Sequence, residues 1–341
     1  MRKFLYNLAT DKSQGLLAFV LKFLLFILSL IYGLAIRLIS LILGLAKINL
    51  RAKVISIGNI TLGGTGKTSL VEYVAGLLKD KGKAVAILTR GYGSGDEPQM
   101  LENNLGSVAV IVGSNRIKSG RRAIKEYCAD TLILDDGFQQ WHLKKDLNIV
   151  TIDSSAPFGN RNMIPRGILR EPLSALKRAD VFVLTKTDLA QGVDKIKAAL
   201  RRINNKADIF ESVHKPVNFY RMSEPERALP LNSLKGKTAA IFCGIGDPES
   251  FERLITNCGI NIGLSHRFHD HYDYTDADLE RIILEAEGKS ISTIITTEKD
   301  ASRIINSGLN DFNSKFTVLR VELEIKENER FNLRLFSLYS V

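Results

Sequence analysis

The chain has 341 residues, of which 45% are hydrophobic and 25% charged, and its formal net charge is +10. These values are those of a folded protein of more than one domain, and the basic excess suits an anionic partner: nucleic acid, an acidic membrane surface or a phosphorylated substrate. Cys128, Cys243 and Cys258 lie far apart in the sequence, which argues against a disulfide framework and predicts packing roles in a reducing compartment.

The N-terminal region predicts a membrane helix. Residues 15–46 are almost wholly apolar, with Lys22 and Arg37 as the charged exceptions. The uncharged run 23–36 is short for a hydrocarbon core of ~30 Å, but the flanking cations can snorkel toward the headgroups. We therefore expect an anchoring helix within residues 1–50 that spans the bilayer or lies in its interface. A buried helical hairpin is the alternative, and the internal Arg37 disfavours a cleaved signal peptide.

A phosphate-binding loop follows. The strand Val54–Ile57 leads into the glycine-rich loop 58–69, and residues 70–79 then have helical spacing. Glycines let backbone N–H groups turn toward phosphate oxygens, Lys67 supplies a positive charge to the β- and γ-phosphates, and Thr68 offers a hydroxyl to Mg²⁺. Thr61 replaces the first glycine of the usual pattern, and a plain glycine turn is the alternative. The predicted nucleotide-binding residues are Thr61, Leu62, Gly63, Gly64, Thr65, Gly66, Lys67, Thr68 and Ser69.

Further β-strands are predicted at residues 84–88, 108–112, 131–134, 147–152 and 181–184, with helical stretches between several of them. This alternation predicts an α/β fold of the P-loop NTPase kind, with a doubly wound, mainly parallel sheet. The strand 131–134 ends in Asp135-Asp136-Gly137, where a carboxylate can hold Mg²⁺ beside the phosphate loop. The pattern leaves open which acid binds the metal directly, and a solvated turn is the alternative.

A smaller second domain is expected after a connector near Val217, where Pro216, Pro225 and Pro230 interrupt the pattern. Strands at 237–242, 292–296 and 316–321 and a helix at 276–287 would build an α/β layer that closes over the nucleotide. The expected boundaries are 1–50 for the membrane helix, 51–225 for the P-loop core and 226–341 for the C-terminal domain.

The ordered loop motifs resemble those of the tetraacyldisaccharide 4'-kinase family across nearly the whole chain. Beside the phosphate loop they are Thr89-Arg-Gly-Tyr-Gly93, Gly95-Asp-Glu-Pro98, Asp135-Asp-Gly-Phe-Gln-Gln140, Phe158-Gly-Asn160, Pro165-Arg-Gly-Ile-Leu-Arg-Glu-Pro172, Phe242-Cys-Gly-Ile-Gly-Asp-Pro-Glu-Ser-Phe251, Asp270-His-Tyr272 and Thr296-Thr-Glu-Lys-Asp300. No single motif is specific, but the ordered set is.

The resemblance implies phosphorylation of the 4'-hydroxyl of a tetraacylated glucosamine disaccharide 1-phosphate in lipid A biosynthesis, with ATP and Mg²⁺, at the cytoplasmic side of the inner membrane. It implies that Asp96 activates the sugar hydroxyl, that His271 assists it, and that Lys67 is catalytic. Arg170 and Glu171 would place nucleotide or substrate, and Thr68, Asp135 and Asp136 would serve Mg²⁺. The implied partners are the lipid disaccharide and the membrane leaflet, and no obligate protein partner is inferred.

Three departures from the family pattern bear on these roles. Ser69 replaces a common proline at the start of a helix, where proline contributes shape rather than chemistry. Gln140 stands where the family has histidine, so a role for that imidazole falls away unless the nearby His142 compensates. A shorter stretch than usual precedes Asp96, which makes the position of this residue less secure.

Several rival interpretations stay open in the sequence. His266, His269 and His271 with neighbouring aspartates could form a transition-metal site or an exposed polar loop. Thr185-Lys-Thr-Asp188 resembles the guanine-reading element of GTPases, which makes a membrane GTPase or a non-catalytic nucleotide switch the second function. Arg116, Lys118, Arg121, Arg122 and Lys125 form a basic helical stretch that is either a solvated face or a contact for lipid phosphate, and no nucleic-acid-binding motif accompanies it.

Overall fold

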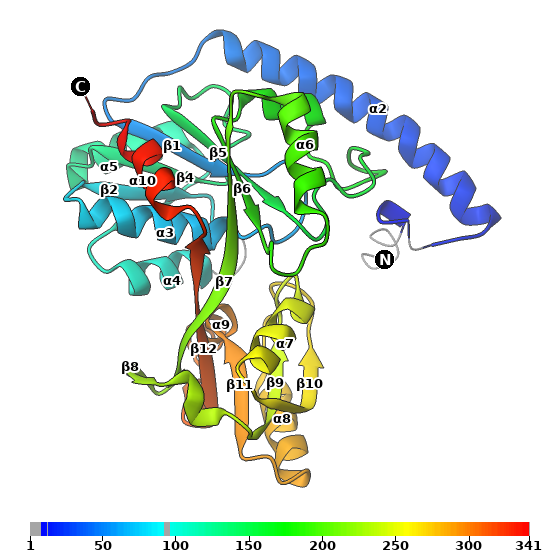
Figure 1. Ribbon diagram of the computed structural model, residues 1–341, viewed down its shortest axis with the longest axis vertical. Coiled ribbons are helices and arrows are strands. Elements are labelled where there is room, and N and C mark those ends of the chain that lie inside the picture. Colours follow the sequence, from blue (N-terminus) through cyan, green and yellow to red (C-terminus); the bar gives the residue numbers. More distant parts are fainter. Residues whose placement is uncertain (1–7, 12, 92–95, 341) are drawn as a thin grey trace. The chain divides into compact units, whose positions relative to one another are not determined.

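The computed structural model describes residues 8–11, 13–91 and 96–340, except for the side chains of Asp96 and Asn310. The chain forms two compact units, each assembled from separated segments. The first unit contains residues up to Thr89, then 113–213 and 325 onward, and the second contains 90–112 and 214–324 (Figure 1).

The first unit is built on a parallel sheet whose strand order is β7-β6-β5-β1-β4-β2. Its strands are β1 (Lys53–Gly58), β2 (Val85–Thr89), β4 (Thr131–Asp135), β5 (Leu147–Asp153), β6 (Val181–Thr185) and the first part of β7 (Asp208–Arg221). The registered pairs among them are all parallel. β2, β4 and β6 are buried at every position, as expected for Val/Ile/Leu-rich parallel strands covered on both faces. The predicted doubly wound P-loop architecture is confirmed.

The helices of the first unit are α2 (Leu16–Leu45), α3 (Lys67–Asp80), α5 (Arg116–Tyr127), α6 (Val193–Ile203) and α10 (Asn328–Phe336), with a 3-10 helix at Leu173–Arg178. α10 brings the C-terminal segment into this unit because its apolar face is buried there. The Phe331 ring lies 5.2 Å from the ring of Phe210 in β7 and 6.1 Å from that of Tyr73 in α3.

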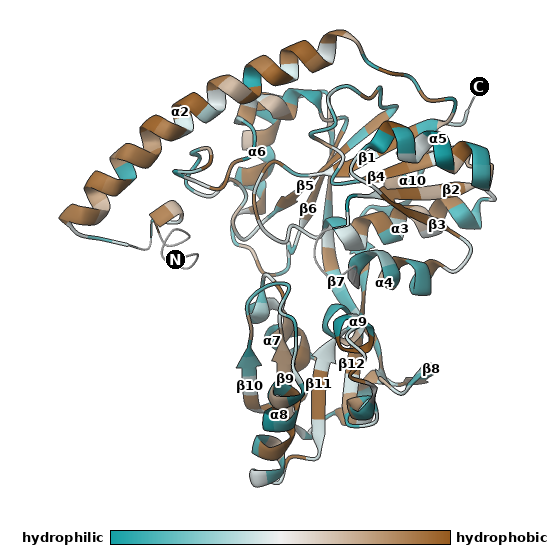
Figure 2. Cartoon of the chain, turned by 180° about the vertical axis from the view of Figure 1, so that it is seen from behind, coloured by the Kyte–Doolittle hydropathy of each residue, from teal (hydrophilic) through white to brown (hydrophobic). Residues whose placement is uncertain are grey.

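Helix α2 is apolar on nearly all sides, and its large side chains are mostly exposed (Figure 2). It is the one helix among the described residues that is long and apolar enough to cross a membrane, by length and composition. Its buried residues are small: Ala18, Ser29 and Gly33. A Cβ at Gly33 would lie 3.1 Å from the sulfur of Met163, so this helix approaches the core closely at its middle.

The second unit carries the sheet order β10-β9-β11-β12-β7, with β8 antiparallel to β7. Its strands are β3 (Ala109–Val112), β8 (Glu224–Leu229), β9 (Thr238–Cys243), β10 (Asn261–Arg267), β11 (Thr293–Thr297) and most of β12 (Phe316–Ile325). Its helices are α4 (Asp96–Leu105), α7 (Pro248–Asn257), α8 (Asp276–Gly288) and α9 (Glu298–Asn306), with 3-10 turns at Leu231–Leu234 and Asn310–Phe312. α4 packs against α9. Separate apolar clusters cover the two faces of its sheet.

The structure divides the chain differently from the expected ranges 51–225 and 226–341, since both units take up separated segments. The expected connector is wrong: residues 208–229 form β7 and β8, which pair with each other. Pro216 fits inside β7 because it lies between the residues registered with β6 and those registered with β8. Pro225 lies in β8, which is outside the main strand order and pairs with β7.

All three cysteines are free, but their surroundings differ. Cys243 is buried in the core of the second unit, where burial raises the pKa of its thiol to about 12. Cys128 is exposed and ends α5 with a left-handed backbone (φ 51°), so the packing role expected for it is wrong.

Candidate active site

The glycine-rich loop lies between β1 and α3, at the carboxyl edge of the parallel sheet. Gly63 and Gly66 have left-handed φ values of 112° and 77°, which side-chain-bearing residues rarely adopt. Gly66 is the N-cap of α3, so the first N–H groups of this helix face the loop. The predicted strand, loop and helix are therefore confirmed, and a helix start of this kind suits an anion.

The loop is braced from both sides by side chains at the ends of neighbouring strands. The Thr65 hydroxyl lies 2.8 Å from that of Thr151 in β5, and the Thr185 hydroxyl donates to the Thr65 carbonyl at 3.1 Å. The amide of Leu62 donates to the Ile168 carbonyl at 2.8 Å. These contacts hold the backbone of the loop before any phosphate arrives.

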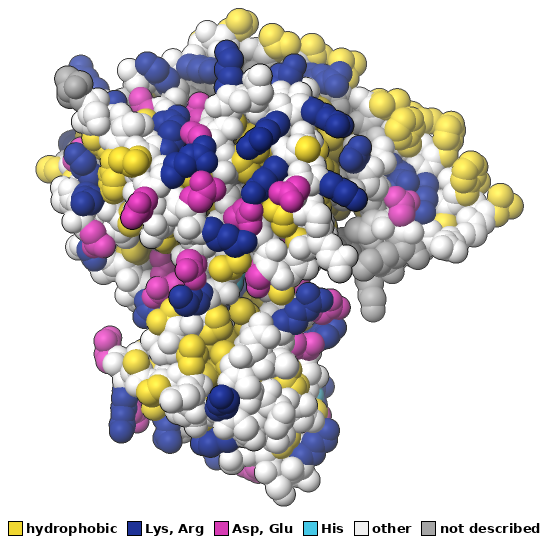
Figure 3. Space-filling view, in the orientation of Figure 1, with side chains coloured by type: hydrophobic (Ala, Val, Ile, Leu, Met, Phe, Trp, Pro, Cys, Tyr) yellow, Lys and Arg dark blue, Asp and Glu magenta, His cyan; other side chains and the backbone are white. Residues whose placement is uncertain are grey.

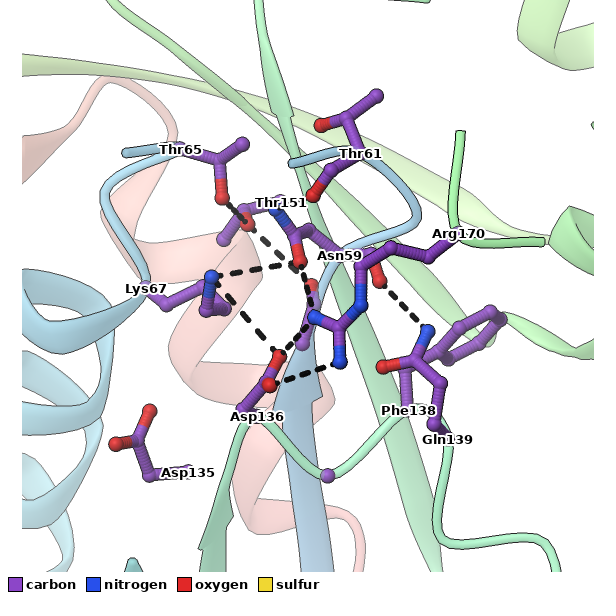
Figure 4. Close-up of polar contacts among 12 residues, drawn as sticks. Asn59, Thr61, Thr65, Lys67, Asp135, Asp136, Phe138, Gln139, Thr151 and Arg170 are labelled. Atoms are coloured by element: carbon purple, nitrogen blue, oxygen red, sulfur yellow. Dashed lines mark hydrogen bonds and ion pairs between the residues drawn. The ribbon is translucent and has the colours of Figure 1, made fainter. Parts of the chain in front are cut away.

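The side chains of Lys67, Asp136, Arg170 and Asn59 converge beside this loop (Figure 4). The Arg170 guanidinium donates to both carboxylate oxygens of Asp136, at 2.7 and 3.0 Å. The Lys67 ammonium lies 3.9 Å from the same carboxylate and 3.4 Å from the Asn59 side-chain oxygen, to which Arg170 also donates at 3.3 Å. Asn59 is fully buried and was not predicted from the sequence, although it lies in the quoted loop.

These cations decide the charge of Asp136. Burial by itself would raise the pKa of this carboxyl, but the hydrogen bonds from Arg170 and the charge of Lys67 outweigh it and lower the pKa below its ordinary value. Asp136 is thus a carboxylate held between two cations at neutral pH. An arriving triphosphate would compete with it for the same cations.

Glu171 is turned into the interior rather than toward the loop. The residue is 1% exposed. Its carboxylate accepts hydrogen bonds from Arg178 at 2.7 and 2.9 Å, from Gln139 at 3.0 Å and from the Trp141 indole at 3.3 Å. Gln139 also donates to the Asn59 carbonyl at 3.0 Å. Of the two adjacent residues predicted for the site, Arg170 therefore lies beside Lys67. Glu171 instead holds Gln139, Trp141 and Arg178 together in the interior.

Arg116 is buried, unlike the solvated basic face expected for residues 116–125. It is 2% exposed, and its guanidinium donates to the Asp135 carbonyl at 3.2 Å and to the Gly113 carbonyl. Arg122 of the same helix is exposed and pairs with Glu126 at 2.7 Å. A lipid-phosphate contact by Arg116 is accordingly wrong, because its charge faces the end of β4.

Oxygen donors suited to Mg²⁺ lie at two of the predicted positions. Thr68 lies in the first turn of α3, and Asp135 ends β4 and accepts from the Thr89 hydroxyl at 3.2 Å. Hydroxyl and carboxylate oxygens are ligands that Mg²⁺ prefers. Among the described residues, no three His, Cys, Asp or Glu gather closely enough to hold a metal ion alone. The residues present therefore fit Mg²⁺ that is bound together with nucleotide phosphates, as is usual for this ion.

In the second unit the three histidines diverge. His266 faces Glu285 at 3.3 Å, the His269 ring packs on Tyr272 with centroids 4.7 Å apart, and the half-exposed His271 lies 4.0 Å from the Asp270 carboxylate. The transition-metal alternative finds no support in this arrangement of described residues. His271 has a left-handed φ of 56°, and its amide donates to the Gly244 carbonyl at 3.2 Å.

Helix α9 fixes the peptide that holds His271. The Gly244 amide donates to the Asp300 carboxylate at 3.0 Å, and the Gly244 carbonyl accepts from Arg303 at 2.6 Å. Asp300 and Arg303 are an ion pair with 0% and 1% exposed side chains, and Tyr274 also donates to Asp300 at 3.0 Å. No local pattern singles out Arg303, because its partner Gly244 lies 59 residues away.

The same helix binds the start of α4, where Asp96 lies. The Lys299 ammonium is 2.5 Å from the carboxylate of Glu97, the residue after Asp96. Burial would lower the pKa of Lys299, but the Glu97 carboxylate outweighs it, and with Asp270 nearby the pKa is raised. Lys299 therefore lies close to both the α4 start and the Asp270–His271 loop within one unit. The predicted base Asp96 begins α4, and its side chain lies outside the described residues.

The segment that resembled a guanine-reading element is also held by neighbours. The Lys186 ammonium pairs with Asp153 at 2.6 Å and is 7% exposed, and Thr187 donates to the Ser212 carbonyl at 3.4 Å. Asp188 is exposed. This segment is thus tied to the ends of β5 and β7 through Lys186 and Thr187.

Comparisons with known proteins agree across both units. A family model described as tetraacyldisaccharide-1-P 4'-kinase (LpxK) matches residues 21–339. Two relatives named tetraacyldisaccharide 4'-kinase, from Halothermothrix orenii and Desulfatibacillum aliphaticivorans, are 36% and 34% identical over 96% and 94% of this chain and 95% and 92% of their own. The crystal structure of LpxK from Aquifex aeolicus in complex with ATP matches with a TM-score of 0.73 and 26% identity, over 94% of this chain and 100% of that one. The chain belongs to the tetraacyldisaccharide 4'-kinase family.

Proposed function

We propose that this protein transfers the γ-phosphate of ATP to the 4'-hydroxyl of a tetraacylated glucosamine disaccharide 1-phosphate, a step of lipid A biosynthesis. The observation that carries this function is the family match over residues 21–339, which includes the phosphate loop, the Asp135–Asp136 turn and the unit with Asp96 and His271. A kinase reaction also fits the braced loop with Lys67 beside it. The GTPase alternative is not favoured by these relatives.

The first unit would bind the triphosphate. The loop amides and Lys67 hold phosphate oxygens, and Arg170 turns from Asp136 toward the transferred group as negative charge gathers there. We assign Mg²⁺ to Thr68 and Asp135, because Thr68 lies in the first turn of α3 after the phosphate loop and Asp135 ends the buried strand β4. These two residues would hold Mg²⁺, and the ion would supply positive charge that offsets the negative charge of the phosphates.

The second unit would supply the base. A sugar hydroxyl is a weak nucleophile, so Asp96 would accept its proton while the 4'-oxygen forms a bond to the γ-phosphorus and ADP leaves with the electron pair of the broken bond. His271 would orient or tune Asp96. Support comes from Lys299, which pairs with Glu97 at the α4 start and whose pKa is also raised by the charge of Asp270, the residue before His271.

We further propose that α2 lies in the membrane interface rather than across the bilayer. The first unit holds this helix near its start and at its middle: Lys22 pairs with Asp11 at 2.8 Å, Asp11 with Arg166 at 2.8 Å, and the Tyr32 hydroxyl donates to the Arg170 carbonyl at 3.1 Å. A spanning helix would have to break these contacts. With many exposed apolar side chains along it, some of which are visible in Figure 3, α2 would place the catalytic units at the cytoplasmic leaflet, where ATP is present.

Transfer of labelled γ-phosphate to the disaccharide 1-phosphate in detergent micelles tests the function. Lys67→Ala and Asp96→Asn should each lower turnover by about 10²- to 10⁴-fold, since each removes a group that acts on the reacting atoms. Asp188→Asn is the matched control, and it should leave the preference for ATP over GTP unchanged. Nucleotide hydrolysis without phosphate transfer to the lipid would instead identify a GTPase. So would a wild-type preference for GTP that is lost in Asp188→Asn.

A further inference from the structure

The turn after β4, residues 135–138, holds Asp136 in a left-handed backbone conformation. Its φ of 53° is uncommon for residues other than glycine. The next residue, Gly137, has no room for a side chain, because a Cβ there would lie 2.5 Å from the Leu134 Cβ. The Asp136 carboxylate faces Lys67 and Arg170 (Figure 4). The shape of this acid turn therefore decides where the carboxylate lies.

The amine of Lys145 is bound to the acid turn. Its Nζ donates to the Gly137 carbonyl at 2.7 Å and to the Phe138 carbonyl at 3.0 Å. The Phe138 backbone in turn packs against the start of the phosphate loop, because a Cβ at Gly58 would lie 2.7 Å from the Phe138 amide nitrogen. One side chain thus contacts the two residues that follow Asp136 and, through Phe138, the segment that enters the loop.

The backbone around Lys145 is fixed by contacts outside the acid turn. The Lys144 amide donates to the Ile48 carbonyl at 2.9 Å, and the Asp146 amide donates to the Val54 carbonyl at 2.8 Å. The Asp146 carboxylate also accepts from the Val54 amide at 2.8 Å. Val54 lies in β1, the strand that leads into the phosphate loop. Lys145 therefore holds the carbonyls of the acid turn relative to that strand.

A lysine at this position is costly for the fold. Burial of the Lys145 amine, together with repulsion from Arg178 and Lys47, lowers its pKa to about 7, although the Glu171 carboxylate opposes the shift. The folded protein thus disfavours the charged amine. A neutral amine still has two N–H groups, one for each of the two carbonyls. A residue that is costly for stability and makes two specific hydrogen bonds is expected where function needs the geometry.

We propose that Lys145 is a positioning residue for phosphate transfer, which holds the acid turn in the shape that keeps the Asp136 carboxylate against Arg170. The inference rests on the proposed function, because it gives this turn a part in the transfer. Lys145 acts through backbone carbonyls, and no bond-making step is assigned to it. A displacement of the Asp136–Arg170 pair by about 1 Å would slow the transfer by about 100-fold, while the loop amides would still bind the triphosphate.

Steady-state kinetics of the full chain in detergent micelles, with ATP and the disaccharide 1-phosphate, test this proposal. Lys145→Met should lower kcat by about 10- to 100-fold and change the KM for ATP by less than about threefold. Lys145→Arg keeps donors for both carbonyls and should hold kcat within about fivefold of the wild type. Lys144→Met, which removes the exposed neighbouring cation, is the matched control and should behave like the wild type.

A double variant separates positioning from a purely structural role. If Lys145 acts through the Asp136–Arg170 pair, adding Lys145→Met to Arg170→Lys should lower kcat/KM for ATP by less than about threefold further, because the pair is already displaced. Urea unfolding of Lys145→Met at neutral pH should show a midpoint close to that of the wild type. The loss of two hydrogen bonds is there offset by the removal of a disfavoured amine.

Wild-type kcat in Lys145→Met would overturn the proposal. So would a Lys145→Arg protein as slow as Lys145→Met, or losses that multiply in the double variant. A loss of kcat that disappears when the rate is divided by the folded fraction would assign the amine to stability alone and would also overturn it. Failure of the proposed function is distinguishable from these results, because the wild-type protein would then transfer no phosphate to the disaccharide.

Discussion

Substitution of Arg303 by methionine tests whether α9 holds the His271 loop. Arg303 and Asp300 form an ion pair with almost no exposed surface, and both also bind the Gly244 peptide. Arg303→Met removes the cation and leaves a buried carboxylate whose remaining hydrogen-bond donors include Gly244, Tyr274 and Thr297. Breaking a buried pair in this way costs about 3–5 kcal/mol in the free energy of unfolding.

The pH dependence of that loss follows from Asp300. Burial already raises the pKa of this carboxyl despite the groups that donate to it, and removal of Arg303 should raise the pKa further. Between about pH 3.9, the ordinary pKa of an aspartate in the unfolded chain, and the raised pKa of Asp300 in the folded variant, only the folded variant holds the proton. The stability of the variant is therefore higher in acid and falls as pH rises through the folded pKa. The penalty relative to the wild type should therefore be smaller at mildly acidic pH than at pH 8.

Urea unfolding followed by circular dichroism measures this loss, while fluorescence of the single tryptophan, Trp141, reports the first unit separately. The circular dichroism transition of Arg303→Met should shift to lower urea, and Trp141 should change little if the units unfold separately. Asp300→Asn/Arg303→Met should be more stable than the single variant, since no buried charge is left unpaired. A loss below about 1 kcal/mol in Arg303→Met, or strictly additive losses in the double variant, would refute the reasoning.

Three further predictions concern the first unit. Arg170→Lys loses the two-point contact with Asp136 and should reduce kcat/KM for ATP by about 10- to 100-fold while the melting temperature changes little; wild-type turnover would contradict this. Burial and nearby cations lower the pKa of Lys145 to about 7, so stability should rise between pH 7 and about pH 10, and Lys145→Met should remove this rise in urea titrations across pH. Gly58→Ala places a Cβ 2.7 Å from Phe138 and should cost about 1–3 kcal/mol in urea unfolding, whereas an unchanged midpoint would show that the turn can shift freely.

The local patterns of the first half of the chain were sufficient for much of the fold. The apolar strand, the glycine loop and the helix after it are specified by patterns of neighbouring residues. They appear as β1, the loop and α3 within a few residues of the predicted bounds. The acid pair after β4 was found for the same reason, because a carboxylate at the end of a buried strand is visible in the sequence. The roles of Asp96 and His271 stay predictions from the family resemblance.

The tertiary structure decided which polar groups meet. Glu171 looks like a site residue in sequence, but its burial among Gln139, Trp141 and Arg178 becomes apparent when distant segments are placed together. Lys299 and Glu97 are 202 residues apart, and no periodicity connects them.

The sequence alone determined the class of fold, the glycine-rich loop, the apolar N-terminal helix and the family, because each depends on a short pattern or on an ordered set of short patterns. Tertiary structure decided that α10 returns to the first unit, that Arg116 is buried at the end of β4, and that α9 holds the Gly244 peptide. These features depend on which surfaces of distant segments pack against each other and are thereby removed from water. Burial of that kind is a property of the packed chain, since any local segment exposes the same side chains until its distant partners cover them.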